Sequence, residues 1–113
     1  MNFKTKLNLE YHQARKAVLD EFEKSVQESN KEYEIFLEEV AQLFVGGKFR
    51  REFFKCKTQA LIMLNKEHET AQVIMRTKLE LIELQFEEAR RVVDQVAVSV
   101  WFQGDDKTLP TYN

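Results

Sequence analysis

The sequence has few of the residues that interrupt helices. Its 113 residues include three glycines and one proline, and residues 5–45 and 48–103 contain neither. Charged residues make up 32% of the chain and hydrophobic residues 43%. Long uninterrupted segments of this composition are typical of amphipathic helices, not of sheets or disordered chains. The sequence therefore predicts a single all-α domain over residues 1–103.

The chain also lacks a second cysteine, an apolar leader and a long hydrophobic segment. A single cysteine excludes an intrachain disulfide and favours a reducing compartment. Residues 1–6 are charged and are not followed by the apolar core of a signal peptide. The most apolar segment, residues 92–102, is too short to cross a bilayer and contains Asp94. We expect a cytoplasmic protein without a membrane anchor.

Apolar side chains recur along the first segment at steps of four and three residues. The repeat is Leu7, Tyr11, Ala14, Val18, Phe22, Val26, Ser29, Tyr33, Phe36, Val40 and Leu43. Such heptad spacing produces an apolar face along a helix, and Leu19, Leu37 and Phe44 widen this face on one side. The pattern predicts a helix over residues 5–45, with Thr5 as its N-cap and Gly46 at its C-terminal cap.

The second segment has a similar spacing and a wider apolar face. Its main repeat is Leu61, Leu64, His68, Ala71, Met75, Leu79, Ile82, Phe86, Ala89, Val93, Val96 and Val100, beside a second row of Phe49, Cys56, Ala60, Met63, Ile74 and Leu81. It predicts one helix over residues 48–103, with a face too wide for a single partner helix. Within residues 89–102 the valines also alternate with period two, so that a β-strand is an alternative there. Residues 104–113 are expected to form an extended tail.

The pair Gly46-Gly47 predicts a turn between these two helices. The result is a long antiparallel, coiled-coil-like hairpin in which residue i lies opposite about residue 93 − i. In that register the first helix ends opposite Glu88, and residues 89–102 have no partner within the chain. Because the wide apolar face must also be covered, we expect a homo-oligomer, either a dimeric four-helix bundle or a larger assembly.

The unpartnered end of the second helix is the first candidate interaction site. Its apolar residues are Val92, Val93, Val96, Val100, Trp101 and Phe102. An exposed apolar patch of this kind marks a protein interface, and the two aromatic residues are of the type that anchors binding hot spots.

A basic segment directly after the glycines is the second candidate. Its cations are Lys48, Arg50, Arg51, Lys55 and Lys57, and Phe54 lies among them on a helical wheel. Positive charge at the start of a helix opposes the helix dipole, and an aromatic ring between cations can stack on a nucleic-acid base. In the alternative interpretation the cations are solvated and the neighbouring phenylalanines cap the bundle. The chain's net charge of -2 favours this alternative.

Three polar features fit structural roles better than chemical ones. An acidic stripe on the first helix consists of Glu21, Glu28, Glu32 and Glu39. Because no Glu-x-x-His pair accompanies it, a solvated face or an interhelical ion-pair face is favoured over a metal site. His68, with Ser25 and Ser29 roughly opposite, is expected to form a polar layer that fixes the register, since no nucleophile turn is present. Cys56, although it lies between two lysines, is expected to fill the core.

No catalytic, cofactor-binding or metal-binding residues are predicted, because the chain contains no phosphate loop, zinc-ligand spacing or calcium loop. The sequence predicts a non-enzymatic protein–protein interaction module: an adaptor, an assembly factor or an inhibitor. It would dock through the apolar C-terminal end of the second helix and the tail. The alternative is a nucleic-acid-binding module that uses residues 48–57.

Overall fold

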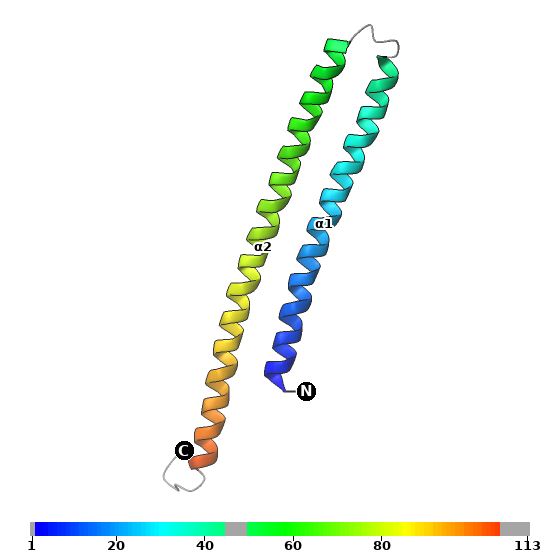
Figure 1. Cartoon of the computed structure of the whole chain (residues 1–113). Coiled ribbons are helices and arrows are strands. Elements are labelled where there is room, and N and C mark those ends of the chain that lie inside the picture. The colour runs from blue at the N-terminus through cyan, green and yellow to red at the C-terminus, as the bar shows by residue number, and fades with distance from the viewer. Residues whose placement is uncertain (1, 45–49, 107–113) are drawn as a thin grey trace. The chain divides into compact units, whose positions relative to one another are not determined.

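The computed structural model of the chain describes residues 2–44 and 50–106, and the side chains of residues 2–44 and 50–96. It contains two α-helices, α1 (Phe3–Leu43) and α2 (Arg50–Asp106), which form a helical hairpin (Figure 1). The predicted all-α hairpin is therefore confirmed for these residues. The turn expected at Gly46 and Gly47 lies outside the described residues.

α1 begins at Phe3 because Asn2, and not Thr5, caps the helix. The Asn2 side-chain oxygen Oδ1 accepts a hydrogen bond from the Thr5 backbone N–H at 2.8 Å. This is the bond that an N-cap side chain makes to the third residue of a helix. Asn2 and Thr5 are both acceptable N-cap residues, and the prediction of Thr5 was wrong.

α2 is helical throughout residues 89–102, so the β-strand alternative does not apply there. Valine lowers helix propensity by only a few tenths of a kcal/mol per residue, and the flanking residues are good helix formers. α2 also includes Gly104 and ends at Asp106, within the segment for which an extended tail was expected.

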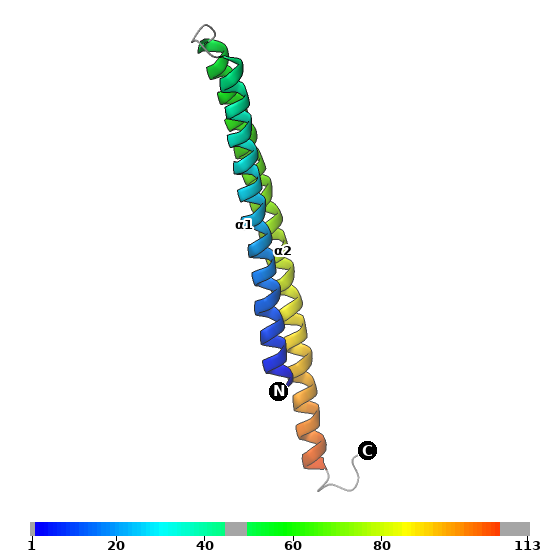
Figure 2. The same ribbon diagram turned by 90° about the vertical axis from the view of Figure 1, so that its right-hand side faces the viewer.

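The two helices pair in two compact units. One unit consists of Met1–Lys16 and Leu79–Asn113, and the other consists of Ala17–Lys78. In each unit a segment of α1 lies beside an antiparallel segment of α2 (Figures 1 and 2). We refer to the first as the open-end unit, because it contains both chain ends, and to the second as the turn-end unit.

Contacts between the helices fix the register within each unit. In the open-end unit Lys4 pairs with Asp94. In the turn-end unit Glu21 pairs with Lys78, and Phe44 packs against the ring of Phe53. In both units, residue i of α1 is therefore roughly level with residue 97 − i of α2. The predicted register differs from this by about four residues, or one helical turn.

The half-buried face of α1 departs from the predicted heptads towards its C-terminal end. Leu37 and Phe44 are half-buried, whereas Phe36 and Leu43, which the heptads place on the seam, are 40% and 77% exposed. The partly buried positions lie about 3.7 residues apart, close to the 3.6 residues per turn of a straight helix. A strict heptad repeat drifts by about 20° every seven residues relative to such a helix, so the two patterns diverge with distance.

Near the start of α2, too, the half-buried face departs from the predicted heptads. Phe53, Cys56 and Ala60 are half-buried there, whereas the predicted seam residue Leu61 is exposed. From Leu64 onward the predicted seam and the half-buried face coincide as far as Val93.

Pairing of the helices buries little apolar surface. Among the residues whose side chains the structure describes, Val40 is the one buried hydrophobic residue, at 5% exposure, and sixteen large hydrophobic side chains are exposed. A folded domain normally buries more than half of the surface that its unfolded chain exposes. The hairpin thus has an apolar seam rather than an enclosed core.

Candidate interaction surfaces

α2 extends past the start of α1 in the open-end unit. Lys4 Nζ lies 3.1 Å from Asp94 Oδ1, so the first turn of α1 reaches as far as Asp94. Beyond this ion pair α2 continues alone to Asp106, a distance of roughly 18 Å at the helical rise per residue (Figure 2). The prediction placed the start of this extension at residue 89. That was too early by about six residues, because the predicted register was off by about four residues and α1 begins at Phe3, two residues before the predicted start.

The predicted apolar interface lies partly on this extension. Val92 and Val96 are four residues apart, which places them on one helical face, and both are exposed. Val93 is half-buried. Val100, Trp101 and Phe102 belong to α2, but their side chains lie outside the described ones, so their contacts stay a prediction.

Four of the predicted basic residues lie at the start of α2 in the turn-end unit. Arg50, Arg51, Lys55 and Lys57 are all exposed. Within residues 2–44 and 50–96, none of the four takes part in an ion pair. Lys48 lies outside the described residues. The first two turns of α2 therefore carry a net positive charge, with Glu52 as their acidic residue, at the positive end of the helix dipole.

Aromatic rings connect the ends of the two helices at this basic segment. Phe53 is half-buried, with its ring centroid 6.2 Å from that of Phe44 in an edge-to-face arrangement. The Phe54 ring lies 6.3 Å from Phe53, but its side chain is 57% exposed. Phe53 thus corresponds to the expected apolar cap, whereas Phe54 stands among the exposed cations and is available to a ligand.

A groove between α1 and α2 in the turn-end unit was not predicted from the sequence. It has a volume of about 420 Å³ and a mainly apolar lining of Tyr33, Phe36, Cys56, Ala60, Met63 and Leu64. Glu32, Lys55 and Glu67 also line it. We call this side of the turn-end unit the groove face. Its sequence signal is the second apolar row of α2, to which Met63 belongs.

The acidic stripe of α1 borders the groove face. Glu32 lines the groove, and Glu21 lines a smaller hollow of about 70 Å³ farther along the same unit. Both carboxylate oxygens of Glu21 accept hydrogen bonds from Lys78 Nζ at 3.0 Å. Within the described residues, Glu28, Glu32 and Glu39 have no ion pair. Of the four glutamates in the acidic stripe, Glu21 is thus the one that forms an ion pair with α2 among the described residues.

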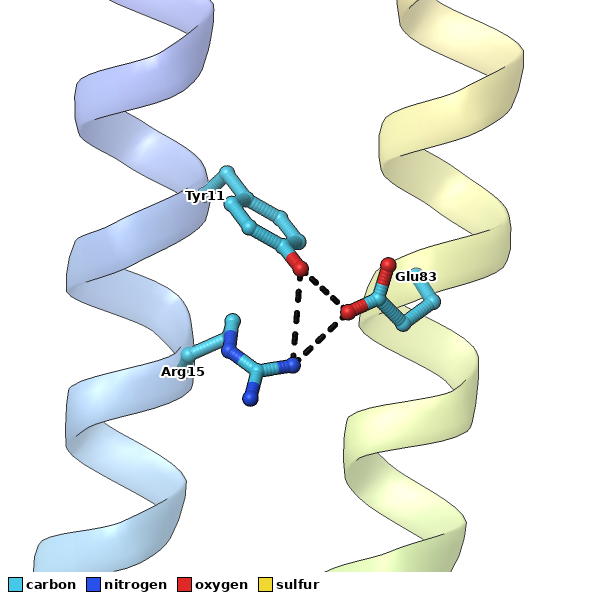
Figure 3. A network of polar contacts seen from close by, with 3 residues as sticks. All are labelled: Tyr11, Arg15 and Glu83. Carbon is cyan, nitrogen blue, oxygen red and sulfur yellow. Dashed lines mark hydrogen bonds and ion pairs between the residues drawn. The ribbon is translucent and has the colours of Figure 1, made fainter.

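The best-connected polar cluster consists of Tyr11, Arg15 and Glu83 in the open-end unit (Figure 3). Glu83 Oε1 accepts a hydrogen bond from the Tyr11 hydroxyl and another from Arg15 Nη1, the second at 2.7 Å. The Arg15 guanidinium also lies over the Tyr11 ring, 5.5 Å from its centroid. The Tyr11 ring also packs against Phe86 with a centroid separation of 4.2 Å. This cluster joins α1 to α2, and sequence reasoning treated Tyr11 only as an apolar seam residue.

The cluster raises the pKa of Tyr11 above its ordinary value. The main cause is the hydrogen bond that Tyr11 donates to Glu83, and partial burial acts in the same direction. The positive charge of Arg15 acts in the opposite direction. The phenol is therefore held in its protonated, hydrogen-bond-donating form, which suits a structural link rather than a proton-transfer site.

His68 and Cys56 both occupy half-buried positions in the turn-end unit. The Nε2 atom of His68 is buried and has no hydrogen-bond partner among the described residues. The register places Ser29 level with His68, as expected, but no hydrogen bond joins them through Nε2. Cys56 is a free thiol in the lining of the groove.

Within residues 2–44 and 50–96, no three His, Cys, Asp or Glu side chains are grouped closely enough to hold a metal ion. In the same part of the chain, neither helix has the combined length and hydropathy that crossing a bilayer requires.

Comparison with known proteins places the chain in a family. The model of DUF7203, a family of unknown function, matches residues 5–113, and the chain belongs to this family. No curated protein and no solved structure was found to match the chain.

Proposed function

We propose that this protein is a non-enzymatic protein–protein interaction module, an adaptor, assembly factor or inhibitor, that docks through the C-terminal extension of α2. The observation that carries the proposal is the continuation of α2 past the Lys4–Asp94 ion pair without a helix beside it. Val92 and Val96 offer an exposed apolar row at the base of the extension. The proposed mode is helix-to-groove or helix-to-bundle docking, with Trp101 and Phe102 as anchors and residues 104–113 adding contacts.

The energetics of a lone helical segment support this proposal. A helical segment of twelve residues is marginal in water on its own, because nucleation is costly and few backbone bonds are gained. A partner that buries the valine row would stabilise the helical extension, by roughly 0.025 kcal/mol for each Å² of apolar surface removed from water.

We also propose that the hairpin associates with copies of itself in a dimeric bundle or a larger assembly. This is supported by the exposure of sixteen large hydrophobic side chains, in a chain with one buried hydrophobic residue among those described. A cytoplasmic location is part of the proposal, since the single cysteine suits a reducing compartment.

A truncation tests docking through the extension. The intact chain and a version ending at Asp94, which keeps the Lys4 ion pair, are each used to capture proteins from the source cells. We expect the captured partner to be identified with the intact chain and lost with the shortened one. The point variant Val96→Asp should weaken capture, whereas Leu84→Asp, an equally exposed position on the same helix, should not. Equal capture by all four proteins would rule out docking through the extension.

A second candidate function is nucleic-acid binding through the basic segment. The specific observation in its favour is that Phe54 is 57% exposed next to exposed, unpaired cations at the start of α2. An exposed ring among cations can stack on an unpaired base while the cations contact phosphates. The net charge of the chain, -2, acts against this function, which therefore ranks second.

A further inference from the structure

The two helical segments of the turn-end unit carry opposite charge. The α1 segment, residues 17–44, has eight acidic and two basic residues, a net charge of −6. The α2 segment, residues 50–78, has three acidic and seven basic residues, a net charge of +4. Within the unit, one ion pair, between Glu21 and Lys78, connects these opposite charges among the described residues. Most of the complementary charge is left available to a partner.

The groove face combines this charge separation with exposed apolar side chains. Phe36 of α1 and Met63 of α2 line the groove and are 40% and 62% exposed. Lys66 follows Met63 by three residues, and Glu28 precedes the groove residue Glu32 by four, so each lies on the same helical face as its neighbour. A partner for this face must therefore supply apolar surface and positive charge opposite α1.

A second copy of the same face meets these requirements in one of its two symmetric arrangements. When two hairpins stack face to face about a two-fold axis parallel to the helices, α2 of each copy lies on α1 of the other. When the axis is perpendicular to the helices, α1 lies on α1 and α2 on α2. The second arrangement sets the acidic stripe of α1, which includes the groove residue Glu32, against the same stripe of the second copy, and like charges in close apposition are destabilising. The first arrangement sets this stripe against α2, whose part of the groove lining carries both Lys55 and Glu67.

We infer that the groove face is a self-association surface, on which α2 of one protomer packs on α1 of a second copy about a two-fold axis parallel to the helices. This inference rests on the self-association proposed above and adds the surface, the partner helix and the register. An isologous arrangement of this kind is the commonest form of homodimer.

The symmetry fixes the register of the interface. A two-fold axis parallel to the helices keeps equivalent residues at one height, so α2 residue j is level with residue 97 − j of the partner's α1, as it is within one chain. Lys66 then lies level with the interval between the partner's Glu28 and the partner's Glu32. None of these three residues has an ion pair within its own chain among the described residues.

The apolar residues meet in the same register. Phe36 of one copy is within about one turn of the partner's Met63, and the two grooves face each other. Packing of these side chains would fill the grooves and bury them between four helices, as in a four-helix bundle.

Charge reversal and mixing test the arrangement. Sedimentation velocity is run on the full chain, on Lys66→Glu, on Glu32→Lys, and on an equal mixture of the two variants. The dimer of each variant alone should dissociate at protein concentrations roughly tenfold higher than the dimer of the unchanged chain. In each variant dimer, residues of like charge face each other at both symmetry-related contacts. The mixture should recover the dimer, because every contact then pairs a Lys with a Glu. A purely intrachain effect of either substitution would not be rescued by mixing.

The outcomes separate the arrangement from self-association itself. A full chain that sediments as a monomer at all concentrations would overturn both. A dimer whose variants are unaffected, or are weakened but not rescued by mixing, would overturn the arrangement and leave self-association standing.

As an apolar test, Phe36→Ser should weaken the dimer, whereas its neighbour Ile35→Ser should not, because Ile35 is 45% exposed but does not line the groove. Equal sedimentation of these two variants, with circular dichroism showing both folded, would count against the groove face.

Discussion

Arg15 and Glu83 join the two helices of the open-end unit through a contact of 2.7 Å between Nη1 and Oε1. The same carboxylate oxygen accepts the Tyr11 hydroxyl, so one acceptor holds two donors from successive turns of α1. The side chains of Arg15 and Glu83 are 34% and 42% exposed, so water screens part of their attraction. The pair nevertheless differs from an ordinary surface ion pair, because it links α1 to α2 and is covered on one side by the Tyr11 ring.

Replacing Glu83 by Gln should destabilise the hairpin by about 1 kcal/mol. The substitution keeps the shape of the side chain but removes its negative charge, so that the bond from Tyr11 becomes neutral and the Arg15 guanidinium donates to a neutral amide oxygen. Urea unfolding followed by circular dichroism gives the change. Glu88→Gln is the matched control, since Glu88 pairs with Arg91 on the same helix and both are about two-thirds exposed. It should cost less than about 0.5 kcal/mol. Equal costs for the two variants would show that the cluster has no special role.

Tyr11→Phe should destabilise the protein at neutral pH and lose that effect in alkali. The pKa of Tyr11 is raised in the folded chain, mainly by its hydrogen bond to Glu83. A raised pKa means that the folded state binds this proton more tightly than the unfolded state. The stabilisation is therefore fully present below the unfolded value of about 10, and is lost as pH rises through the higher folded value.

Thermal unfolding of both proteins between pH 7 and 11 measures this effect. The other two tyrosines are present in both proteins, so the difference in melting temperature isolates Tyr11. We expect a constant difference up to about pH 9 and a decreasing one above pH 10. A difference that grows in alkali would contradict the assigned direction of the pKa shift.

The helices could be predicted because their signals are local. The absence of Gly and Pro and the recurrence of apolar residues each act over a few turns, and both segments are helical over nearly the expected ranges. The N-cap was wrong by three residues, because Asn2 and Thr5 are both good caps and the choice depends on how the chain enters the helix. The valines of residues 89–102 were ambiguous for a similar reason, since β-branched residues fit strands and helices alike when no partner is known.

The register could not be predicted to better than one turn. Sliding one helix past the other by three or four residues brings apolar faces back into contact, so the heptad pattern is compatible with several registers. Under the expected register Arg15 lies level with residue 78, whereas in the structure it reaches Glu83. The Tyr11 cluster and the groove both depend on this shift. They were therefore missed, although Tyr11 and the apolar residues of the groove were noted individually.

If the basic segment binds nucleic acid, the affinity for a single-stranded oligonucleotide should fall steeply as salt rises. Each phosphate contact changes log K by about 0.7 per unit of log salt concentration, so four described cations predict a slope near −3. Lys57→Gln should reduce the slope by about one contact. Phe54→Ala should weaken binding without changing the slope, because stacking releases no counterions.

Fluorescence anisotropy with a labelled oligothymidine over a range of salt concentrations provides the measurement. Ile62→Ala is the control, since Ile62 is an exposed apolar residue of the same helix that lies beyond the basic segment. Absence of binding at low salt would remove the second candidate function. It would leave docking through the C-terminal extension untouched.

His68→Leu should raise the stability of the chain by about 1 kcal/mol and make its association less specific. The buried Nε2 atom of His68 has no hydrogen-bond partner among the described residues, and an unsatisfied buried polar atom costs about 1–3 kcal/mol. Leucine removes that cost at a half-buried seam position. It also removes the one ionisable side chain of the predicted α2 seam, and polar residues at such positions restrict register and oligomeric number.

Thermal unfolding and sedimentation equilibrium should therefore change together, with a higher melting temperature and a mixture of assemblies. His12→Leu, an exposed position on α1, should change neither. A loss of stability in His68→Leu without any change in sedimentation would show that the imidazole makes a favourable contact through its other nitrogen and does not set the register.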